Sequence, residues 1–112
     1  MDIVQAIERV TQVLGDTPLA AFEADWQMQW IVERGVEIIS EASRHLPAEL
    51  KARHPEIPWR NVAGVGNVLR HEYGEVAATV MWRIVRERLP LLYPVCFQEL
   101  ADAQAREGDG PE

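Results

Sequence analysis

Apolar residues recur at intervals of three and four along most of the chain, which is the spacing of helices that bury one face. At the N-terminus the pattern is carried by Ile3, Ile7, Val10 and Leu14. Asp2 precedes it and has a side chain suited to an N-cap. No segment shows the alternation of apolar and polar residues that is typical of a strand. The pattern therefore predicts an all-α fold.

Prolines and glycines divide this pattern into a four- or five-helix bundle. A break at residues 15–18 is followed by one long helix, for which Thr17 is the expected N-cap and Pro18 the first helical residue. Three prolines between residues 47 and 58 predict a loop with at most a turn or two of helix. The predicted helices cover residues 3–14, 18–45, 58–74, 75–88 and 90–104.

The long second helix is expected to supply much of the core. Its apolar and aromatic residues are Phe22, Trp26, Trp30, Ile31, Ile38, Ile39 and Ala42. Between the last two helices, Leu89-Pro90 is expected to end one helix and start the next. In the third helix, Gly64 and Gly66 each lower helix propensity by about 1 kcal/mol relative to alanine. Their presence suggests close packing against another helix or another chain.

The chain has 112 residues and a mass of 12.7 kDa, which is the size of one domain. We assign residues 1–104 to a helical domain and the acidic residues 105–112 to a disordered tail. No apolar run approaches the roughly 20 residues that cross a bilayer, and the N-terminus does not resemble a signal peptide. The single cysteine, Cys96, cannot form an internal disulfide. We therefore expect a cytoplasmic protein with no membrane partner.

Charge is distributed unevenly along the chain. The net charge of −7 argues against general adhesion to nucleic acid or anionic membranes. The segment from Arg44 to Arg70 nevertheless carries +3 and the remainder −10. We expect any polyanion to bind to this basic segment.

Few residue patterns in the chain indicate a catalytic or metal-binding site. A di-metal site in a helical bundle needs Glu-x-x-His pairs, which are absent, so no metal is expected. Glu33, Glu37 and Glu41 form an acidic line that we assign to solvent. The segment GVGNVLRHEYG, residues 64–74, ends an apolar helix with a polar cluster. Its histidine, His71, could act as a general base, or it could cap the helix end as a cation.

Four blocks of sequence resemble the HepT-like toxins of the HEPN superfamily, whose signature is R-x(4)-H-x-Y. They are WIVERGVEIISEA, HPEIPWRNVAG, AGVGNVLRHEYG and VMWRIVRERLPLL, in this order along the chain. The resemblance extends over about residues 1–104. It implies an all-helical homodimer in which two motifs form a composite, metal-independent ribonuclease site. It also implies no cofactor and a minimal nucleotidyltransferase as antitoxin, which in some family systems uses ATP to add AMP to the motif tyrosine.

The resemblance assigns roles to individual residues. His71 corresponds to the motif histidine, Tyr73 to the tyrosine that receives AMP, and Asn67 to an asparagine that often follows the motif arginine. The arginine position itself is Gly66. Arg70 lies about 40° from that position around the helix and about 6 Å along it, so its long side chain could replace the arginine. Arg60 is a further candidate for a phosphate contact.

Three functions therefore remain open at this stage. The first is an active ribonuclease that uses His71, Arg70 and Asn67, and the second is a silent module that binds RNA, nucleotide or a partner after losing the arginine. The third is a structural dimer without a ligand. The four tryptophans and the two helix glycines predict a homodimer with the face from Gly64 to His71 at or near the interface.

Overall fold

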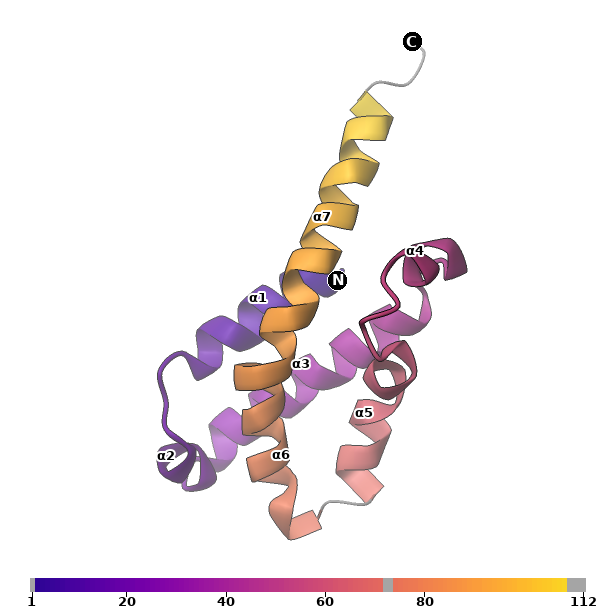
Figure 1. Ribbon diagram of the computed structural model, residues 1–112. Coiled ribbons are helices and arrows are strands. Elements are labelled where there is room, and N and C mark those ends of the chain that lie inside the picture. Colours follow the sequence, from indigo (N-terminus) through magenta and orange to yellow (C-terminus); the bar gives the residue numbers. More distant parts are fainter. Residues whose placement is uncertain (1, 72–73, 109–112) are drawn as a thin grey trace.

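A computed structural model describes residues 2–71 and 74–108 of the chain (Figure 1). Every regular element in these two ranges is a helix, which confirms the all-α prediction. The first, α1 (Ile3–Leu14), begins at Asp2, whose Oδ1 accepts a 2.8 Å hydrogen bond from the Gln5 amide. It ends at Gly15, whose φ of 50° is a conformation that glycine adopts without strain. Both ends of α1 are thus set by local side-chain chemistry.

The predicted long second helix is wrong, because two elements take its place. A short α2 (Leu19–Glu23) is followed by α3 (Trp26–Arg44). Asp25 separates them: its side chain accepts a 3.0 Å hydrogen bond from the Met28 amide and so caps α3. Thr17 is not an N-cap, since α2 begins after Pro18 without a side-chain cap. The Thr17 carbonyl instead accepts hydrogen bonds from Trp82 and Arg86.

The helices α1 and α3 cross at very close range. A Cβ atom at Gly35 of α3 would overlap a methyl group of Val10 in α1. A larger residue at position 35 would therefore require the Val10 side chain to move. Val10 belongs to the main core, whose buried residues are Ile3, Val4, Ala6, Ile7, Val10, Leu14, Phe22, Val32, Val36, Ile39, Ile57, Leu69, Met81, Val85, Leu89, Leu92 and Cys96.

The expectation that the aromatic residues of the second helix enter this core is only partly correct. Phe22 and Ile39 are buried, whereas Trp26, Trp30 and Ile31 are 58%, 68% and 54% exposed. The two tryptophans pack edge to face with ring centroids 5.0 Å apart. They lie on one side of α3, which leaves an apolar surface at the start of this helix.

After α3 the chain forms the short α4 (Ala48–Arg53) and then α5 (Trp59–His71). The prediction of a proline-rich connection with a turn or two of helix is thus confirmed. In α5, Ala63 lies against Ser40 of α3, and Gly66 lies against Glu37. Since higher numbers in one helix meet lower numbers in the other, α3 and α5 are antiparallel.

The remaining helices follow each other without a break. They are the 3-10 turn η1 (Gly74–Val76), α6 (Ala77–Arg83), the π turn η2 (Ile84–Arg88) and α7 (Leu89–Gly108). The predicted separation at Leu89-Pro90 is therefore wrong. A proline ring clashes with the carbonyl four residues earlier in an α-helix. The wider π turn, in which the Leu89 amide bonds to the Ile84 carbonyl, relieves this clash and lets the helix continue.

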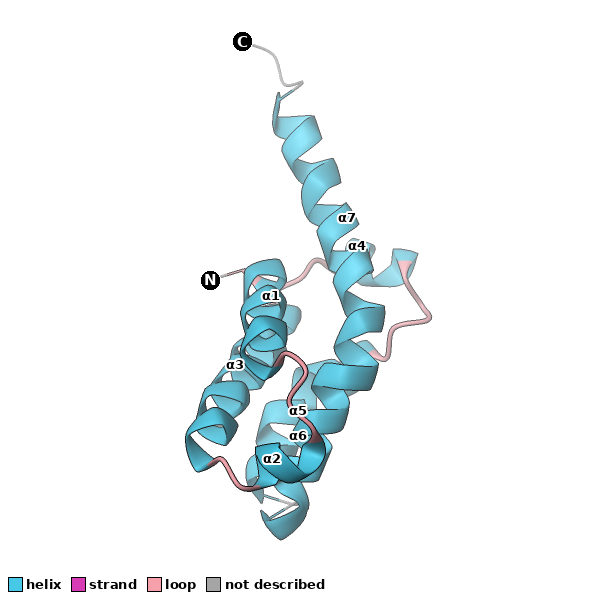
Figure 2. Cartoon of the chain, turned by 90° about the vertical axis from the view of Figure 1, so that its left-hand side faces the viewer, coloured by secondary structure: helices cyan, strands magenta, loops and turns pink. Residues whose placement is uncertain are grey.

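The C-terminal half of α7 projects beyond the other helices (Figures 1 and 2), and the molecule measures 53 × 24 × 20 Å. Residues 105–108, which the sequence placed in a disordered tail, continue this helix, while residues 109–112 lie outside the described ranges. None of the described helices is both long and apolar enough to cross a lipid bilayer.

Candidate functional site

The solvent-facing side of α5 carries three of the residues that the sequence singled out. Arg60, Asn67 and His71 are all exposed, and none makes a side-chain hydrogen bond or ion pair with the residues that the structure describes. At 100° per residue, they and Gly64 lie within an arc of about 60° on one side of the helix. Arg60 and His71 are about 16 Å apart along the axis. We call this line of four residues the α5 outer face.

Two further candidates fall partly or wholly outside what the structure describes. The backbone of Arg70 belongs to the last turn of α5, but its side chain is not described. Tyr73 lies outside the described residues altogether. The structure therefore brings Asn67 and His71 onto one face, and it leaves the roles predicted for Arg70 and Tyr73 untested.

The position of the motif arginine is enclosed by α3. Gly66 is buried, and a Cβ atom there would lie 3.3 Å from Cγ and 3.4 Å from Cα of Glu37. These distances are short, so any side chain at position 66 requires a small displacement of Glu37. The assignment of Glu37 to solvent is accordingly wrong, since this residue is half-buried between α3 and α5.

The outer face is open at Gly64. No atom lies within 4 Å of the place that a Cβ would occupy at this residue. The backbone of α5 is therefore accessible midway between Arg60 and Asn67. Of the two glycines predicted to mark close packing, Gly66 packs against another helix of this chain and Gly64 does not.

Sequence reasoning missed the way in which Arg44 joins the end of α3 to α5. Its Nη1 donates to the Ala63 carbonyl over 2.7 Å and to Ser40 Oγ over 3.3 Å. Ser40 Oγ itself donates to the same carbonyl over 2.6 Å. The spacing of Ser40 and Arg44, one turn apart on α3, was the available signal. These bonds fix the guanidinium of Arg44 beside the first half of α5.

A separate cluster of charged side chains joins α4 to α7. Arg53 forms two hydrogen bonds with the Glu99 carboxylate, at 2.7 and 3.1 Å, and His54 Nε2 lies 2.6 Å from it. The hydrogen bonds from Arg53 and His54 lower the pKa of Glu99 from 4.5 to about 2. Nearby, burial raises the pKa of the Cys96 thiol to about 11. Cys96 is thus a protonated core thiol near neutral pH and a poor nucleophile.

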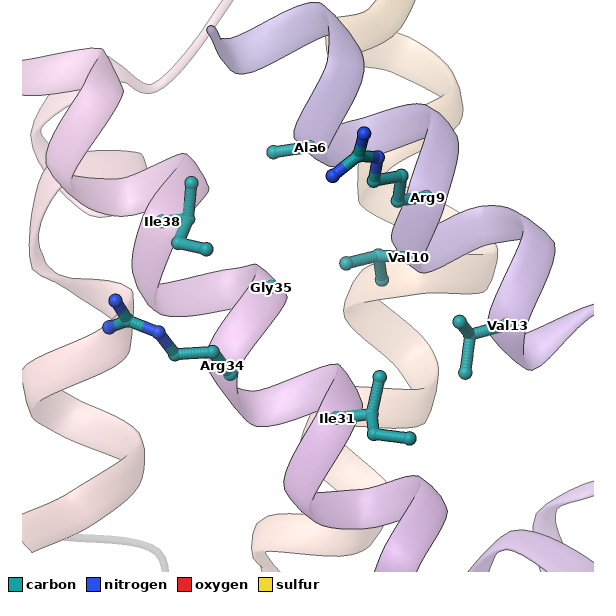
Figure 3. Close-up of a pocket in the computed structure, with 8 residues that line it drawn as sticks. All are labelled: Ala6, Arg9, Val10, Val13, Ile31, Arg34, Gly35 and Ile38. Atoms are coloured by element: carbon teal, nitrogen blue, oxygen red, sulfur yellow. The ribbon is translucent and has the colours of Figure 1, made fainter. Parts of the chain in front are cut away.

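An apolar groove of about 170 Å³ lies between α1 and α3 (Figure 3). Val10, Val13 and Ile31 form part of its wall, and Arg9 and Arg34 also line it, with the Arg34 guanidinium pointing away from α1. None of the candidate residues on α5 lines it. Within residues 2–71 and 74–108, no three His, Cys, Asp or Glu side chains come close enough together to share a metal ion.

Comparison with known proteins establishes the family. A family model described as ribonuclease HepT-like matches residues 3–98, which include every helix up to the middle of α7. The chain belongs to the HepT-like ribonuclease family. The resemblance drawn from the four sequence blocks is therefore confirmed at the level of the family, while the roles of single motif residues remain predictions.

Relatives of this HepT-like chain are named as RNases. A protein of Thermococcus cleftensis named "Probable ribonuclease HepT" is 40% identical over 91 residues, which cover 81% of this chain and 83% of the relative. A protein of Methanocaldococcus jannaschii named as a candidate RNase is 30% identical over 89 residues, which cover 80% and 82%. No solved structure matches the chain significantly.

Proposed function

We propose that this HepT-like chain is a metal-independent endoribonuclease whose site lies at the C-terminal end of α5. The observation that carries the proposal is the exposed position of His71 in the last turn of α5, one turn beyond Asn67, which is also exposed, in a chain of a ribonuclease family. Neither side chain is engaged by a described residue, so both are free to meet a substrate. The relatives named as RNases support RNA as that substrate.

The proposed reaction uses the 2′-hydroxyl of RNA as the nucleophile. His71 removes the hydroxyl proton, the 2′-oxygen attacks the adjacent phosphorus, and the bond to the 5′-oxygen breaks. The departing 5′-oxygen takes up a proton, and the other product is a 2′,3′-cyclic phosphate. Arg70 stabilises the negative charge on the phosphate in the transition state, and Asn67 orients the imidazole or the phosphate. Arg60 holds the substrate strand farther along α5.

We further propose that two copies of the chain complete the site. A homodimer whose interface lies beside the face from Gly64 to His71 brings two imidazoles close together, so that one can accept a proton and the other can donate one, and this face stays accessible to RNA. Control by a nucleotidyltransferase antitoxin is also proposed, with Tyr73 as the residue that receives AMP from ATP. The added phosphate charge would repel RNA from the adjacent site.

A second function is favoured by one observation, the burial of Gly66 under Glu37. If the site requires a guanidinium at position 66, the chain cannot supply one there, and Arg70 is its nearest replacement. The alternative is a catalytically silent HEPN-like module that binds RNA, nucleotide or a partner protein. The two functions differ in whether the chain breaks RNA.

Incubation of the purified full chain with labelled single-stranded RNA in EDTA distinguishes them. We expect cleavage products that end in a 2′,3′-cyclic phosphate, and we expect His71→Ala to remove nearly all cleavage. Arg70→Ala is expected to cost about 100- to 1000-fold in rate, since it removes one charge-stabilising donor. His45→Ala, which removes another exposed imidazole at the end of α3, is the matched control and should cleave normally.

Two results would contradict the nuclease proposal. Intact RNA after incubation with the wild-type chain at high concentration would favour the silent module. Cleavage that persists in His71→Ala would indicate a contaminating nuclease. Modification is tested by intact mass after addition of the partner with ATP and Mg²⁺, where Tyr73→Phe should lose the AMP adduct. Tyr93→Phe should keep it, because the Tyr93 hydroxyl is hydrogen-bonded to Glu8 of α1.

A further inference from the structure

The fold gathers cations from different elements at one corner of the molecule. The contacts of Ser40 with Ala63 and of Glu37 with Gly66 set the antiparallel register of α3 and α5. At 1.5 Å per residue in both helices, this register places Arg44 level with the first turn of α5, where Arg60 lies. Two arginines that are 16 positions apart in the sequence therefore occupy neighbouring turns of adjacent helices.

The last turn of α4 lies at the same corner of the molecule. Trp59, the residue before Arg60, donates its indole N–H to the carbonyls of Lys51 and His54 over 3.1 and 3.0 Å. Lys51 therefore lies beside the start of α5. We call Arg44, Lys51 and Arg60 the basic corner. The positive end of the α5 dipole lies at the same place and adds to its potential.

The cations of the basic corner are available to a ligand to different degrees. Arg60 has no hydrogen bond or ion pair with the described residues. Arg44 makes its hydrogen bonds to described residues through Nη1 alone. Arg53 does not belong to the corner, because Glu99 holds its guanidinium. The acidic residues of the region lie nearby but are dispersed: Glu41 is three positions before Arg44, Glu49 is on α4, and Glu56 is 3.5 Å from His54 Nδ1.

The outer face of α5 connects this corner to His71. It runs about 16 Å from Arg60 to His71, and Gly64 leaves open space at its midpoint. A polyanionic strand lying along it would meet cations at one end and the histidine at the other. Arginine is suited to this task because its planar group bonds to two phosphate oxygens at once.

We propose that the basic corner of Arg44, Lys51 and Arg60 is a phosphate-binding subsite that holds single-stranded RNA along the outer face of α5, with the strand continuing to His71. The inference rests on the proposed nuclease function for the identity of the ligand. It adds the place and direction of the bound strand. Contacts of this kind position a nucleic acid but do not read its sequence, so the subsite should accept any RNA sequence.

The test measures the affinity of the full chain for a fluorescent single-stranded RNA at several salt concentrations in EDTA. All variants carry His71→Ala, which prevents cleavage during the titration. Arg60→Gln should weaken binding severalfold and lower the slope of log affinity against log salt by about 0.7, the value for one lost phosphate contact on a single strand. Arg44→Gln should act in the same direction. Arg106→Gln, the same change at an exposed arginine on the projecting part of α7, should alter neither quantity.

The inference is overturned if Arg60→Gln keeps the parent's salt slope, if it matches Arg106→Gln, or if the parent binds no RNA at low salt. Cleavage by the wild-type chain is measured in parallel and separates the two proposals. Normal cleavage together with an unchanged slope in Arg60→Gln overturns the subsite alone. Absence of cleavage together with a slope that depends on Arg60 overturns the nuclease alone and supports the subsite.

Discussion

Two glycines in α5, separated by one residue, have opposite surroundings. Gly64 has open space where a Cβ would lie, whereas Gly66 faces Glu37 at 3.3 to 3.4 Å. Replacing a helix glycine by alanine removes a propensity cost of about 1 kcal/mol. The gain is available in full only where the new methyl group meets no neighbour. The two positions therefore form a matched pair that tests the packing of α5 on α3.

We expect Gly64→Ala to raise the free energy of unfolding by up to about 1 kcal/mol. Gly66→Ala should gain less or lose stability, because Glu37 has to move. Urea denaturation of the two variants and the parent measures the difference. Equal gains would contradict the close contact with Glu37. A loss in Gly64→Ala would mean that a second molecule covers this position in solution.

The sequence predicts the candidate site only in part. Asn67 and His71 lie one turn apart, and a helix necessarily places such residues on one face. The enclosure of Gly66 and the hydrogen bonds of Arg44 depend on the register between α3 and α5. That register follows from contacts between residues 23 positions apart, such as Ser40 and Ala63, which helical periodicity does not encode.

Among the elements, α4 is held mainly by polar contacts. It contains no buried residue, and Arg53 and the following His54 bind the Glu99 carboxylate of α7. Folding lowers the pKa of Glu99 from 4.5 to about 2, so the carboxylate stabilises the fold fully above about pH 4.5. This stabilisation disappears as the pH falls from about 4.5 towards 2. Protonation of Glu99 thus weakens its contacts with Arg53 and His54.

We expect Glu99→Gln to lower the melting temperature at pH 7 and to have a smaller effect at pH 3, where part of the stabilisation by the carboxylate is already lost. The wild type should therefore lose more stability than the variant between these two pH values. Glu107→Gln, which removes an exposed carboxylate near the end of α7, serves as the control and should follow the wild type. Parallel pH profiles of the wild type and Glu99→Gln would contradict the role of Glu99.

Helix boundaries were predictable where local chemistry determines them. Asp2 and Gly15 mark the two ends of α1 as expected, and α5 begins after the prolines that precede Trp59. The prediction of one long second helix is wrong because the sequence around Asp25 is compatible both with an interior helix position and with the N-cap of a new helix. Pro90 predicts a break in the helix, because no residue pattern in the sequence marks the π turn that precedes it. At both places the local sequence is compatible with two backbone conformations, and tertiary packing determines which one forms.

At the scale of the whole molecule, the main prediction is a homodimer. Light scattering at micromolar concentration should give twice the monomer mass of 12.7 kDa. Asn67→Glu should weaken the dimer, since two-fold symmetry brings the two new charges together. Asn61→Glu introduces the same charge on the same helix, about 120° around the axis, and should leave the dimer intact. A wild-type monomer under these conditions would remove the composite site.

The π turn at η2 has a consequence for changes in chain length. A π turn contains one residue more than the α-helical turn it replaces. Deleting the exposed Glu87 would leave a regular α-helical turn, and because the π turn already absorbs the extra residue, α7 would keep nearly the same rotation relative to α6. Leu92 and Cys96 would then stay in the core, but the Pro90 ring would meet the carbonyl four residues earlier. We therefore expect homologous chains that lack one residue between α6 and α7 to lack the proline at position 90 as well.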